Sequence, residues 1–386
     1  MTLLYIDPQS YDNLEIYDKS LLNQLPNDCN ILYACSFLMK AGGLSSNIEA
    51  LPLFNYNRKK GPAKALSYCC SLFKILLLIR KRRPSVMHIQ WLRMAPIDSW
   101  FYLLLRKVFG IKIVFTAHNL LPHDSGERYK GIYQKFYKRI DAIIVHDFNS
   151  KNELIEKFEI ESEKISVIKH GVLSFDLSEE KVEEEKKSIL EEYGITPQQL
   201  VFSSLGIQGY YKGTDTLIKV WTNCAKLRDN SNCKLVIAGR CGVLDIESLE
   251  AFKNVVVENK YLSDERLMAF LKISDVLLLP YRTISQSGVL LSAIGIKTPF
   301  LVSNIGGLAE PLLVADVGWK IEKCDEKMLE TALIQLVEFP EVVRNKKYDN
   351  ALAWDMVQKA YSWKEIAQKT WALYYSIVDN REAIEK

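Results

Sequence analysis

Several common sequence signals are missing from this chain of 386 residues. It contains eight cysteines but no Cys-x-x-Cys pair, which argues against a disulfide framework and against a zinc site, so we expect reduced thiols. The first residues, MTLLYIDPQS, lack a basic stretch that leads into an apolar core and a cleavage site, so we expect no secretory signal and a cytoplasmic protein. No internal repeat is visible.

Long hydrophobic runs are missing as well. The longest run, Ala65–Ile79, is interrupted by Lys74 and is shorter than the roughly 20 residues that cross a bilayer, so the sequence predicts no membrane-spanning helix. Apolar residues nevertheless make up 48% of the chain, which is enough for full hydrophobic cores, and the length predicts two or three domains.

Charge is distributed unevenly, although the formal net charge is only +3. Residues 1–170 hold 24 Lys and Arg against 16 Asp and Glu, whereas the remainder holds 26 against 31. The stretch from Asn57 to Arg139 has 18 basic residues and three acids. This pattern predicts an anionic partner near the surface that the stretch forms.

Short β-branched and aromatic runs recur at intervals that leave room for a helix, which is typical of parallel α/β sheets. In the first half, these runs are residues 3–6, 31–35, 86–90, 112–116, 142–146 and 165–168. In the second half, they are residues 200–205, 234–239, 254–258, 275–280 and 299–303. The sequence therefore predicts the α/β class with two doubly wound sheets.

A polar, highly charged segment separates the two series of runs. It covers residues 176–199 and closes on Thr196-Pro197, which is typical of a domain connection. We place the boundary near Gly171, with a first domain over 1–171, a connection over 172–198 and a second domain over 199–362. Open α/β sheets bind ligands at the carboxyl ends of their strands, so the residues that follow each run are the candidates for a site.

The run 200–205 leads into a segment with the composition of a phosphate-binding loop. Gly206, Gly209 and Gly213 supply mobile backbone, and Lys212 lies near the expected start of a helix. Glycine backbone, a cation and a helix amino terminus together suit a diphosphate. An ordinary loop with a surface lysine is the alternative.

A second segment of this kind follows the run 275–280. It reads TISQSGVLLSA, in which hydroxyls and free amides near Gly288 suit an anion. A plain helix cap at Ser285 or Ser287 is the alternative. Two such loops in one half of the chain are harder to dismiss than one.

In the first half, the run 112–116 ends in AHNLLPHD, which contains His118, Asn119, His123 and Asp124. A histidine beside an asparagine can hold sugar hydroxyls or a developing charge. A metal site is an alternative, but no third histidine follows at helical spacing. A structural histidine is the alternative for His123 above all.

In the order and spacing of these segments, the chain resembles a family 4 glycosyltransferase with the GT-B fold over nearly its whole length. The matching segments are FTAHNLLPH, VIKHGV, YKGTDTLI, LVIAGR, NVVVENKYLSDERL, LPYRTISQSGVL, KTPFLVSNIGGLAE and YSWKEIAQKTWALYY. Any one of them alone would be a weak signal. The resemblance implies two Rossmann-like domains facing across a cleft, with a helix over 363–386 returning to the first domain.

The resemblance implies retaining transfer from a UDP- or GDP-linked sugar donor, with no cofactor and no obligatory metal. The second domain would bind the donor, and the first would bind a lipid-linked glycan acceptor of capsule, O-antigen or exopolysaccharide synthesis. A nucleotide-sugar epimerase, a phosphorylase and a catalytically degenerate homologue that binds a glycan or a partner are the alternatives.

The resemblance also implies roles for individual residues. The leaving diphosphate would meet Lys212, Arg240, Ser287 and Gly288. The nucleobase would lie at Lys260, Tyr261 and Leu262. The transferred sugar would face His118, and the sugar and acceptor would lie near Asn119, Gly306 and Glu310.

The sequence departs from the family pattern in three places. The paired acids eight residues apart are replaced by Ile284 or Ser285 and by Ser292 or Ala293, which leaves ribose recognition unassigned. The arginine that usually precedes the lysine is replaced by the stretch Ile207-Gln208-Gly209. The glycine-rich turn after the first strand is replaced by a turn that begins at Asp7, so the acceptor geometry is open.

The basic stretch 58–83 holds nine Lys and Arg and no acid around an apolar run. It suits an anionic lipid surface, so we expect peripheral binding to the inner face of the cytoplasmic membrane. The alternative is that 65–79 is a buried helix that packs on the sheet, which we expect for most of its apolar residues. Nucleic acid is not expected, because no nucleic-acid-binding motif accompanies the charge.

Overall fold

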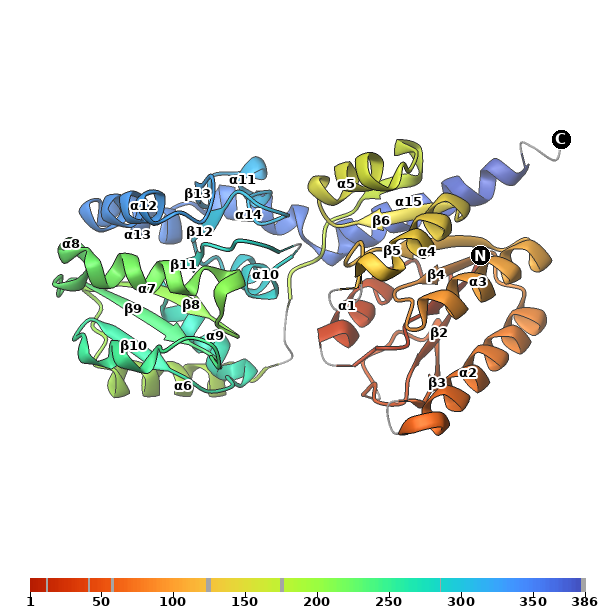
Figure 1. Cartoon of the computed structure of the whole chain (residues 1–386), viewed down its shortest axis with the longest axis horizontal. Helices are drawn as coiled ribbons and strands as arrows, with labels where there is room; N and C mark the ends of the chain where they lie inside the picture. The colour runs from red at the N-terminus through yellow and green to blue at the C-terminus, as the bar shows by residue number, and fades with distance from the viewer. Residues whose placement is uncertain are drawn as a thin grey trace. The chain divides into compact units, whose positions relative to one another are not determined.

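The computed structural model describes residues 1–11, 13–40, 42–56, 59–122, 126–173, 177–284 and 286–382. The chain forms two compact units. The first contains Met1–Gly171 and Ser362–Lys386, and the second contains Val172–Tyr361. Each unit is built on one parallel sheet covered by helices (Figure 1). The predicted α/β class with two doubly wound sheets is therefore confirmed.

The first sheet has seven parallel strands in the order β3-β2-β1-β4-β5-β6-β7. They are β1 (Thr2–Ile6), β2 (Asn30–Ser36), β3 (Ile48–Phe54), β4 (Val86–Ile89), β5 (Lys112–Thr116), β6 (Ala142–Val145) and β7 (Ile165–Val167). The central strands are buried on both faces, which explains their continuous apolar runs.

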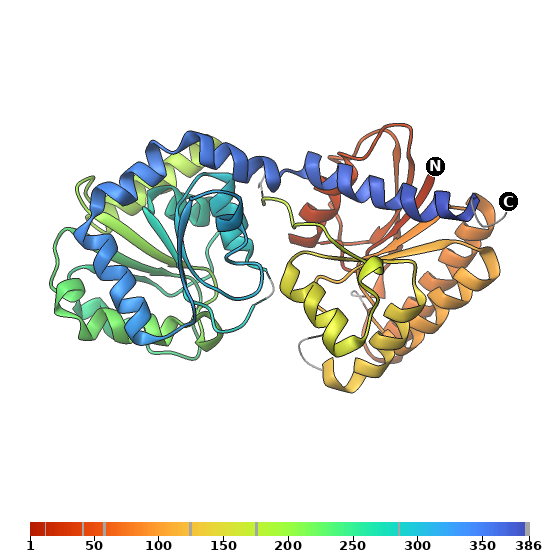
Figure 2. The ribbon, with the colours of Figure 1, turned by 90° about the horizontal axis from the view of Figure 1, so that it is seen from above.

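Helices cover both faces of the first sheet. One face carries α2 (Gly61–Arg82), α3 (Ala95–Phe109), α4 (Gly126–Arg139) and α5 (Phe148–Phe158), which share a core with Leu4 and Ile6 of β1. The other face carries α1 (Asn13–Leu22) and α15 (Trp363–Glu382), which share a core with Leu3 and Tyr5. Figure 2 shows α15, in dark blue, lying along the first unit.

The second sheet has six parallel strands in the order β10-β9-β8-β11-β12-β13. They are β8 (Leu200–Leu205), β9 (Cys233–Ala238), β10 (Val255–Glu258), β11 (Val276–Leu279), β12 (Phe300–Ser303) and β13 (Gly318–Ile321). Its helices are α6 (Glu179–Glu192), α7 (Thr214–Asn223), α8 (Ala225–Arg228), α9 (Asp264–Ile273), α10 (Gly288–Gly295), α11 (Pro311–Val314), α12 (Glu326–Glu338), α13 (Pro340–Tyr348) and α14 (Ala351–Ala360).

The charged segment that we expected to be a connection is instead part of the second unit. It forms α6, which begins at the capping residue Ser178 and buries Val182 and Ile189. On its polar side, Glu185 and Glu192 accept hydrogen bonds from Arg266 of α9 at 2.8 and 2.9 Å. The charges of this segment therefore bind a neighbouring helix.

The helix α2 corrects the expectation for the run 65–79. Tyr68, Leu72, Ile75 and Ile79 are buried in the first core. Several other apolar side chains of the helix are exposed, so the run is less buried than expected. By length and composition α2 would also qualify as a membrane span, against the prediction, and 28% of its most apolar window is buried.

Candidate active site

Five loops of the second unit lie side by side at one edge of its sheet. They follow β10, β9, β8, β11 and β12, which are neighbours in this order. Because the strands are parallel, their carboxyl ends share this edge. These loops and the start of α10 contain the residues that the sequence suggested for the diphosphate and the nucleobase, and two of those suggested for the sugar or acceptor. They are Lys212, Arg240, Ser287 and Gly288 for the diphosphate, Lys260, Tyr261 and Leu262 for the nucleobase, and Gly306 and Glu310 for the sugar or acceptor.

Lys212 is a buried cation just before α7, with 6% of its surface exposed. Its Nζ donates to the carbonyl oxygen of Leu205 at 2.7 Å and lies 5.5 Å from the centre of the Tyr281 ring. Burial lowers the pKa of Lys212 to about 8. Among the described residues, no carboxylate lies within ion-pair distance of this amine. A buried cation of this kind suits an anionic ligand.

Tyr281 connects Lys212 with the second predicted phosphate loop. Its hydroxyl lies 3.4 Å from Ser287 Oγ, while Lys212 lies over its ring. Ser287 caps α10, because its Oγ accepts a hydrogen bond from the amide of Leu290 at 3.4 Å. The plain cap is therefore present, and it places the amino terminus of α10 at Gly288 next to the lysine loop. The other candidate cap, Ser285, lies outside the described residues.

Glycines in these loops serve close packing, whereas the sequence suggested mobility. Gly213 has φ 69°, and a Cβ there would lie 2.1 Å from the carbonyl oxygen of Pro280. Gly239, with φ 132°, approaches the Gly206 carbonyl so closely that a Cβ would lie 2.0 Å from it. The backbone at the ends of β8, β9 and β11 therefore packs too closely for a side chain at either glycine.

Gln208 fills the region where the family pattern has an arginine. Its side chain is buried, and its Nε2 donates to the carbonyl oxygens of Ser204 and Gly206 at 3.0 and 2.8 Å. Its Oε1 accepts from the hydroxyl of Thr214 at 2.9 Å. The neutral amide therefore fixes the loop that carries Lys212, and it adds no charge for a ligand.

Two arginines lie at the same edge of the second sheet. The side chain of Arg240 is exposed, and its carbonyl accepts from the amide of Gln208 at 2.9 Å. Arg282, which follows β11, donates to both carboxylate oxygens of Asp215 at 2.6 and 2.8 Å. The charge of Arg282 is thus balanced by Asp215. Arg240 is exposed and takes part in no ion pair among the described residues.

The residues suggested for the nucleobase follow the edge strand β10. The side chain of Tyr261 is 80% exposed, whereas Leu262 is buried. The Nζ of Lys260 lies 3.3 Å from Glu258 Oε1. An exposed ring at a strand end offers a surface on which a base can stack.

Gly306 and Glu310 follow β12. Gly306 has φ 51°, and Glu310 is a buried acid directly before α11. Burial first, and the charge of Glu310 second, raise the pKa of Tyr361. Ser292, at the place of a missing acid, donates its hydroxyl to the carbonyl of Gly288 at 3.0 Å, so it serves α10.

The first unit gathers four histidines at the carboxyl ends of neighbouring strands. They are His88 in β4, His118 after β5, His146 after β6 and His170 after β7. Tyr17 of α1 contacts the rings of three of them edge-on, with centroids 4.9 to 5.7 Å apart. His118 is half-buried and stacks on Trp91, with ring centroids 4.9 Å apart.

A chain of hydrogen bonds ends on His118 and sets its tautomer. The carbonyl of Ile168 can only accept, so His146 donates to it from Nδ1 at 2.8 Å. The Nε2 of neutral His146 is then an acceptor, and His118 donates to it from Nδ1 at 3.2 Å. We therefore assign the Nδ1–H tautomer to neutral His118.

The other end of the chain reaches the carboxyl-terminal helix. In the structure the Oε1 of Gln90 lies 2.9 Å from His118 Nε2, and the Nε2 of Gln90 lies 3.0 Å from His88 Nε2. The Nδ1–H tautomer of neutral His118 requires the opposite orientation of this amide, in which the NH₂ group donates to His118 Nε2. Its oxygen then accepts from His88, whose Nδ1 accepts the hydroxyl of Tyr374 at 2.5 Å. With the oxygen facing His118, as in the structure, Nε2 of His118 must carry a proton, and the contact between His118 Nδ1 and His146 Nε2 is a hydrogen bond only if one of the two rings carries a second proton.

Burial keeps these histidines neutral. It lowers the pKa of His88 to about 3, with His146 as the second cause. Burial, followed by His146 and the other two histidines, lowers the pKa of His118 well below its usual value. The pKa of His146 is lowered by burial too, against the Ile168 carbonyl, which raises it. A neutral His118 can accept or donate a hydrogen bond without adding charge beside a sugar.

Sequence reasoning found only His118 of this cluster. His146 ends the predicted strand 142–146, and His170 ends the segment VIKH, so a histidine after each of three neighbouring strands was the available signal. Asn119 follows His118 and is half-buried. His123 and Asp124 lie outside the described residues. Among those described, no group of three or more His, Cys, Asp or Glu side chains could hold a metal.

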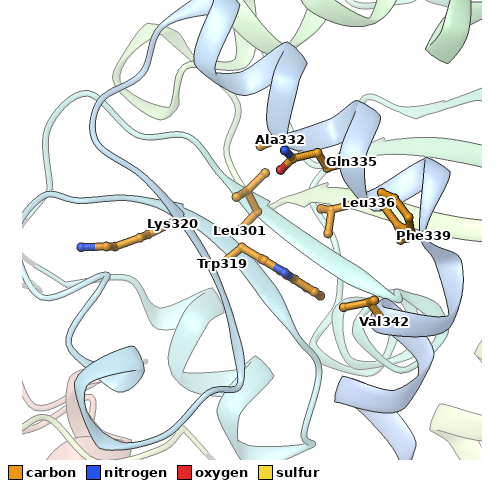
Figure 3. Close-up of a pocket in the computed structure, with 8 residues that line it drawn as sticks. All are labelled: Leu301, Trp319, Lys320, Ala332, Gln335, Leu336, Phe339 and Val342. Carbon is orange, nitrogen blue, oxygen red and sulfur yellow. The ribbon is translucent and has the colours of Figure 1, made fainter.

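A hollow of about 280 Å³ lies elsewhere in the second unit (Figure 3). It lies among β12, β13, α12 and α13, and its lining is Leu301, Trp319, Lys320, Ala332, Gln335, Leu336, Phe339 and Val342. In Figure 3 the side chain of Lys320 points away from the others, so the hollow is mainly apolar. It lacks the converging cations that a diphosphate needs, so it is not the candidate site.

Comparison with known families divides the chain as the structure does. Residues 34–173 match the model of Glycosyltransferase Family 4, and residues 185–352 match Glycosyl transferases group 1. The chain carries two glycosyltransferase domains. Together the two matches support a family 4 enzyme.

The chain is also similar to two curated proteins, each at low sequence identity. It is 26% identical over 263 residues to the uncharacterised glycosyltransferase MJ1607 of Methanocaldococcus jannaschii, with 66% of this chain and 65% of that protein covered. It is 24% identical over 190 residues to the N-acetyl-alpha-D-glucosaminyl L-malate synthase of Bacillus anthracis, with 48% of each chain covered. The matches thus span less than two thirds of either relative.

Superposition on solved structures identifies the fold of the chain. A glycosyltransferase from Rickettsia africae superposes with a TM-score of 0.68 at 17% identity, over 98% of both chains. HepE of Anabaena, crystallised with UDP and glucose, gives a TM-score of 0.68 at 13% identity, over 97% of this chain and 99% of that one. The predicted GT-B fold is therefore confirmed.

Proposed function

We propose that this glycosyltransferase moves a sugar from a nucleoside-diphosphate donor to a lipid-linked glycan, with retention of the anomeric configuration and without a metal. The observation that carries the proposal is the convergence of Lys212, Tyr281 and Ser287 in the second unit. A buried cation beside a helix amino terminus is a site for a diphosphate. The crystal structures of HepE in complex with UDP or UDP-glucose support a uridine nucleotide as the first donor to test.

The proposed transfer of the sugar depends on stabilisation of charge in the transition state and needs no protein nucleophile. When the bond between the anomeric carbon and the diphosphate breaks, negative charge grows on the departing oxygen, and Lys212 and the α10 amides stabilise it. The acceptor oxygen bonds to the same face of the sugar, and its proton passes to the departing diphosphate. In this scheme His118, neutral and fixed in one tautomer, orients the sugar through a hydrogen bond.

The setting we propose is the synthesis of a capsule, O-antigen or exopolysaccharide unit at the inner face of the cytoplasmic membrane. The name of the Bacillus anthracis relative, a synthase that joins a sugar to malate, makes a small hydroxy acid the second acceptor to test. Transfer to malate with no transfer to lipid extracts would replace the lipid-linked acceptor in this proposal.

The test has two steps that separate the enzyme from its alternatives. Calorimetry with UDP and with GDP asks whether a donor site exists, and a degenerate scaffold without one gives no heat with either. Product analysis with the matching nucleotide sugar then asks what the site does. An epimerase converts the nucleotide sugar into an isomeric nucleotide sugar without an acceptor. A retaining transferase instead yields free nucleoside diphosphate and an α-linked product from an α-linked donor, with the chelator EDTA present.

A further inference from the structure

The outer surface of α2 and α3 exposes large apolar side chains at helical spacing. On α2 they are Leu66, Phe73 and Leu77, with Cys69 and Cys70 between them. On α3 they are Ile97, Trp100, Leu104 and Val108. Trp100 is 65% exposed and Val108 63%. The two helices cover the same face of the first sheet and contact each other (Figure 1). We call their exposed apolar side chains together the two-helix apolar face.

Cations border this face, and exposed acids are absent from both of its helices. The one acid between residues 59 and 110 is Asp98, which is fully buried and accepts hydrogen bonds from Tyr68 and from the amide of Met94. Lys64, Lys74 and Lys107 are exposed on the same two helices. An apolar surface bordered by positive charge is complementary to an anionic bilayer.

A cationic hollow opens at the carboxyl ends of the same two helices. Its volume is about 760 Å³, and its lining includes Arg80, Arg83 and Lys112 together with Val108 and Phe109 of the apolar face. Lys112 lies 3.5 Å from Asp141 and shares its charge with it. Among the described residues, Arg80 and Arg83 take part in no ion pair. Guanidinium groups in this arrangement match a phosphate.

We propose that the two-helix apolar face docks on an anionic bilayer, with Trp100 and Phe73 entering the interface and the cationic hollow taking a lipid phosphate. The inference deepens the proposed function, because it states how the enzyme would meet a lipid-linked acceptor. It adds apolar contacts to the expectation from the sequence, in which the basic stretch 58–83 would bind the anionic membrane surface.

A bilayer fits this face better than a second copy of the chain does. A symmetric dimer would place the same surface on both sides of its interface, so the cations Arg80, Arg83 and Lys107 of one copy would face the same cationic surface of the other. That arrangement sets like charges against each other, whereas anionic head groups balance them. The apolar side chains then enter the acyl boundary, as in helices that lie in the membrane plane.

The test is co-sedimentation of the whole chain with vesicles of phosphatidylcholine, with and without phosphatidylglycerol. We expect Trp100→Gln to weaken binding to phosphatidylglycerol vesicles about tenfold or more, because a buried apolar contact is lost. Leu352→Gln, a change of an equally exposed side chain on α14 of the second unit, should bind as the wild type does.

The hollow and the apolar face should respond differently to lipid charge. We expect the Arg80→Gln and Arg83→Gln double variant to lose the preference for phosphatidylglycerol but to keep its binding to phosphatidylcholine, with Arg344→Gln on α13 as the control. At about 1 M salt, where screening acts within about 3 Å, wild-type binding should weaken yet persist, because the apolar contacts remain.

Three results would overturn the inference: no sedimentation of the wild type with anionic vesicles, equal sedimentation of Trp100→Gln, or a dimer in solution that Trp100→Gln dissolves. The measurement is independent of catalysis. If transfer to soluble acceptors is found while vesicle binding is not, the docking surface is wrong and the proposed function stands. If the protein binds vesicles but binds neither UDP nor GDP, the proposed function is wrong and the docking surface stands.

Discussion

Lys212 combines a positive charge with near-complete burial, which is unfavourable unless an anion arrives. We expect Lys212→Ala to lower kcat/KM for the donor by about 10²- to 10³-fold, as for the loss of one group that stabilises a transition-state charge. The control is Lys219→Ala on α7, where the lysine is exposed and lies 3.3 Å from Glu326. Steady-state kinetics below saturation measure both, and equal values for the two variants would remove Lys212 from the site.

The lowered pKa of Lys212 predicts a pH dependence. Burial lowers that pKa from 10.5 to about 8, so the free enzyme loses the charge as the pH rises through 8. Since kcat/KM reports the ionisation of the free enzyme, it should fall above pH 8. Lys212→Arg, which stays charged, should remove this alkaline limb whatever its absolute rate. A limb that persists in Lys212→Arg belongs to another group.

Tyr374 is the far end of the hydrogen-bond chain that sets His118. Tyr374→Phe leaves Nδ1 of His88 buried without a donor, which should lower the free energy of unfolding by about 1–3 kcal/mol. The matched control is Tyr375→Phe, one residue further along α15, where the side chain is 44% exposed and the change should be near zero. Urea unfolding of both variants measures the difference.

The Tyr374→Phe variant also tests whether Tyr374 positions His118 or only stabilises the fold. With Tyr374 intact, nitrogen NMR of the histidine rings should show His118 as the Nδ1–H tautomer. In Tyr374→Phe we expect a mixture of tautomers and a lower kcat at temperatures where the variant is folded. A folded variant with an unchanged His118 spectrum would limit Tyr374 to a structural role.

At the scale of elements, Arg266 is the residue that fixes α6 to the rest of the second unit. It contacts buried Glu258 of β10 and also Glu185 and Glu192 of α6. Burial raises the pKa of Glu258, but the hydrogen bonds from Arg266 and Tyr193 outweigh it, so the pKa is lowered. Arg266→Met should therefore lower the free energy of unfolding by about 3–5 kcal/mol, because it leaves Glu258 buried and poorly compensated.

Lys272→Met is the matched control for this change. Lys272 also connects α9 to α6, at 3.0 Å from Glu183, but both side chains are about a third or more exposed. Removing such a surface pair should change stability by less than about 1 kcal/mol. Chemical unfolding followed by circular dichroism measures both variants, and similar losses would mean that burial of Glu258 is not what makes Arg266 important.

Nine of the eleven runs that the sequence predicted are interior strands, and the other two are the edge strands β7 and β10. All eleven predicted runs correspond to strands, and the two missed strands, β3 and β13, lie at sheet edges. An edge strand is half exposed and tolerates residues such as Pro52 and Gly318, so it lacks a continuous apolar run. The charged helix α6 was interpreted as a connection because its partners, Arg266 and Lys272 of α9, lie far along the chain.

The candidate site, too, could be predicted only in part from the sequence. Loops that follow buried strands could be placed at one sheet edge from the sequence, since parallel strands share that edge. The contacts within the edge could not, because Tyr281 meets Lys212 from a strand that lies next to β8 only in the folded sheet. The role of Gln208 was hidden for the same reason, as its partners are backbone carbonyls of two different strands.

At the scale of the whole molecule, each unit has its own core clusters, and the residues suggested for the donor lie in one unit only. A ligand that binds one unit stabilises it by mass action, by about 2.7 kcal/mol at 100 times the dissociation constant. With UDP at 100 times its dissociation constant, the free energy of opening measured by amide hydrogen exchange in the central strands β8, β9 and β11 should rise by about 2.7 kcal/mol. The central strands β1, β4 and β5 of the first unit should keep their exchange rates.

Two controls make this exchange measurement decisive. In Lys212→Ala the same concentration of UDP should leave the exchange of β8 unchanged, because the diphosphate loses its buried cation. If UDP instead slows the central strands of both units equally in the wild type, the two cores unfold as one cooperative body, and the assignment of the donor to the second unit then depends on Lys212 alone.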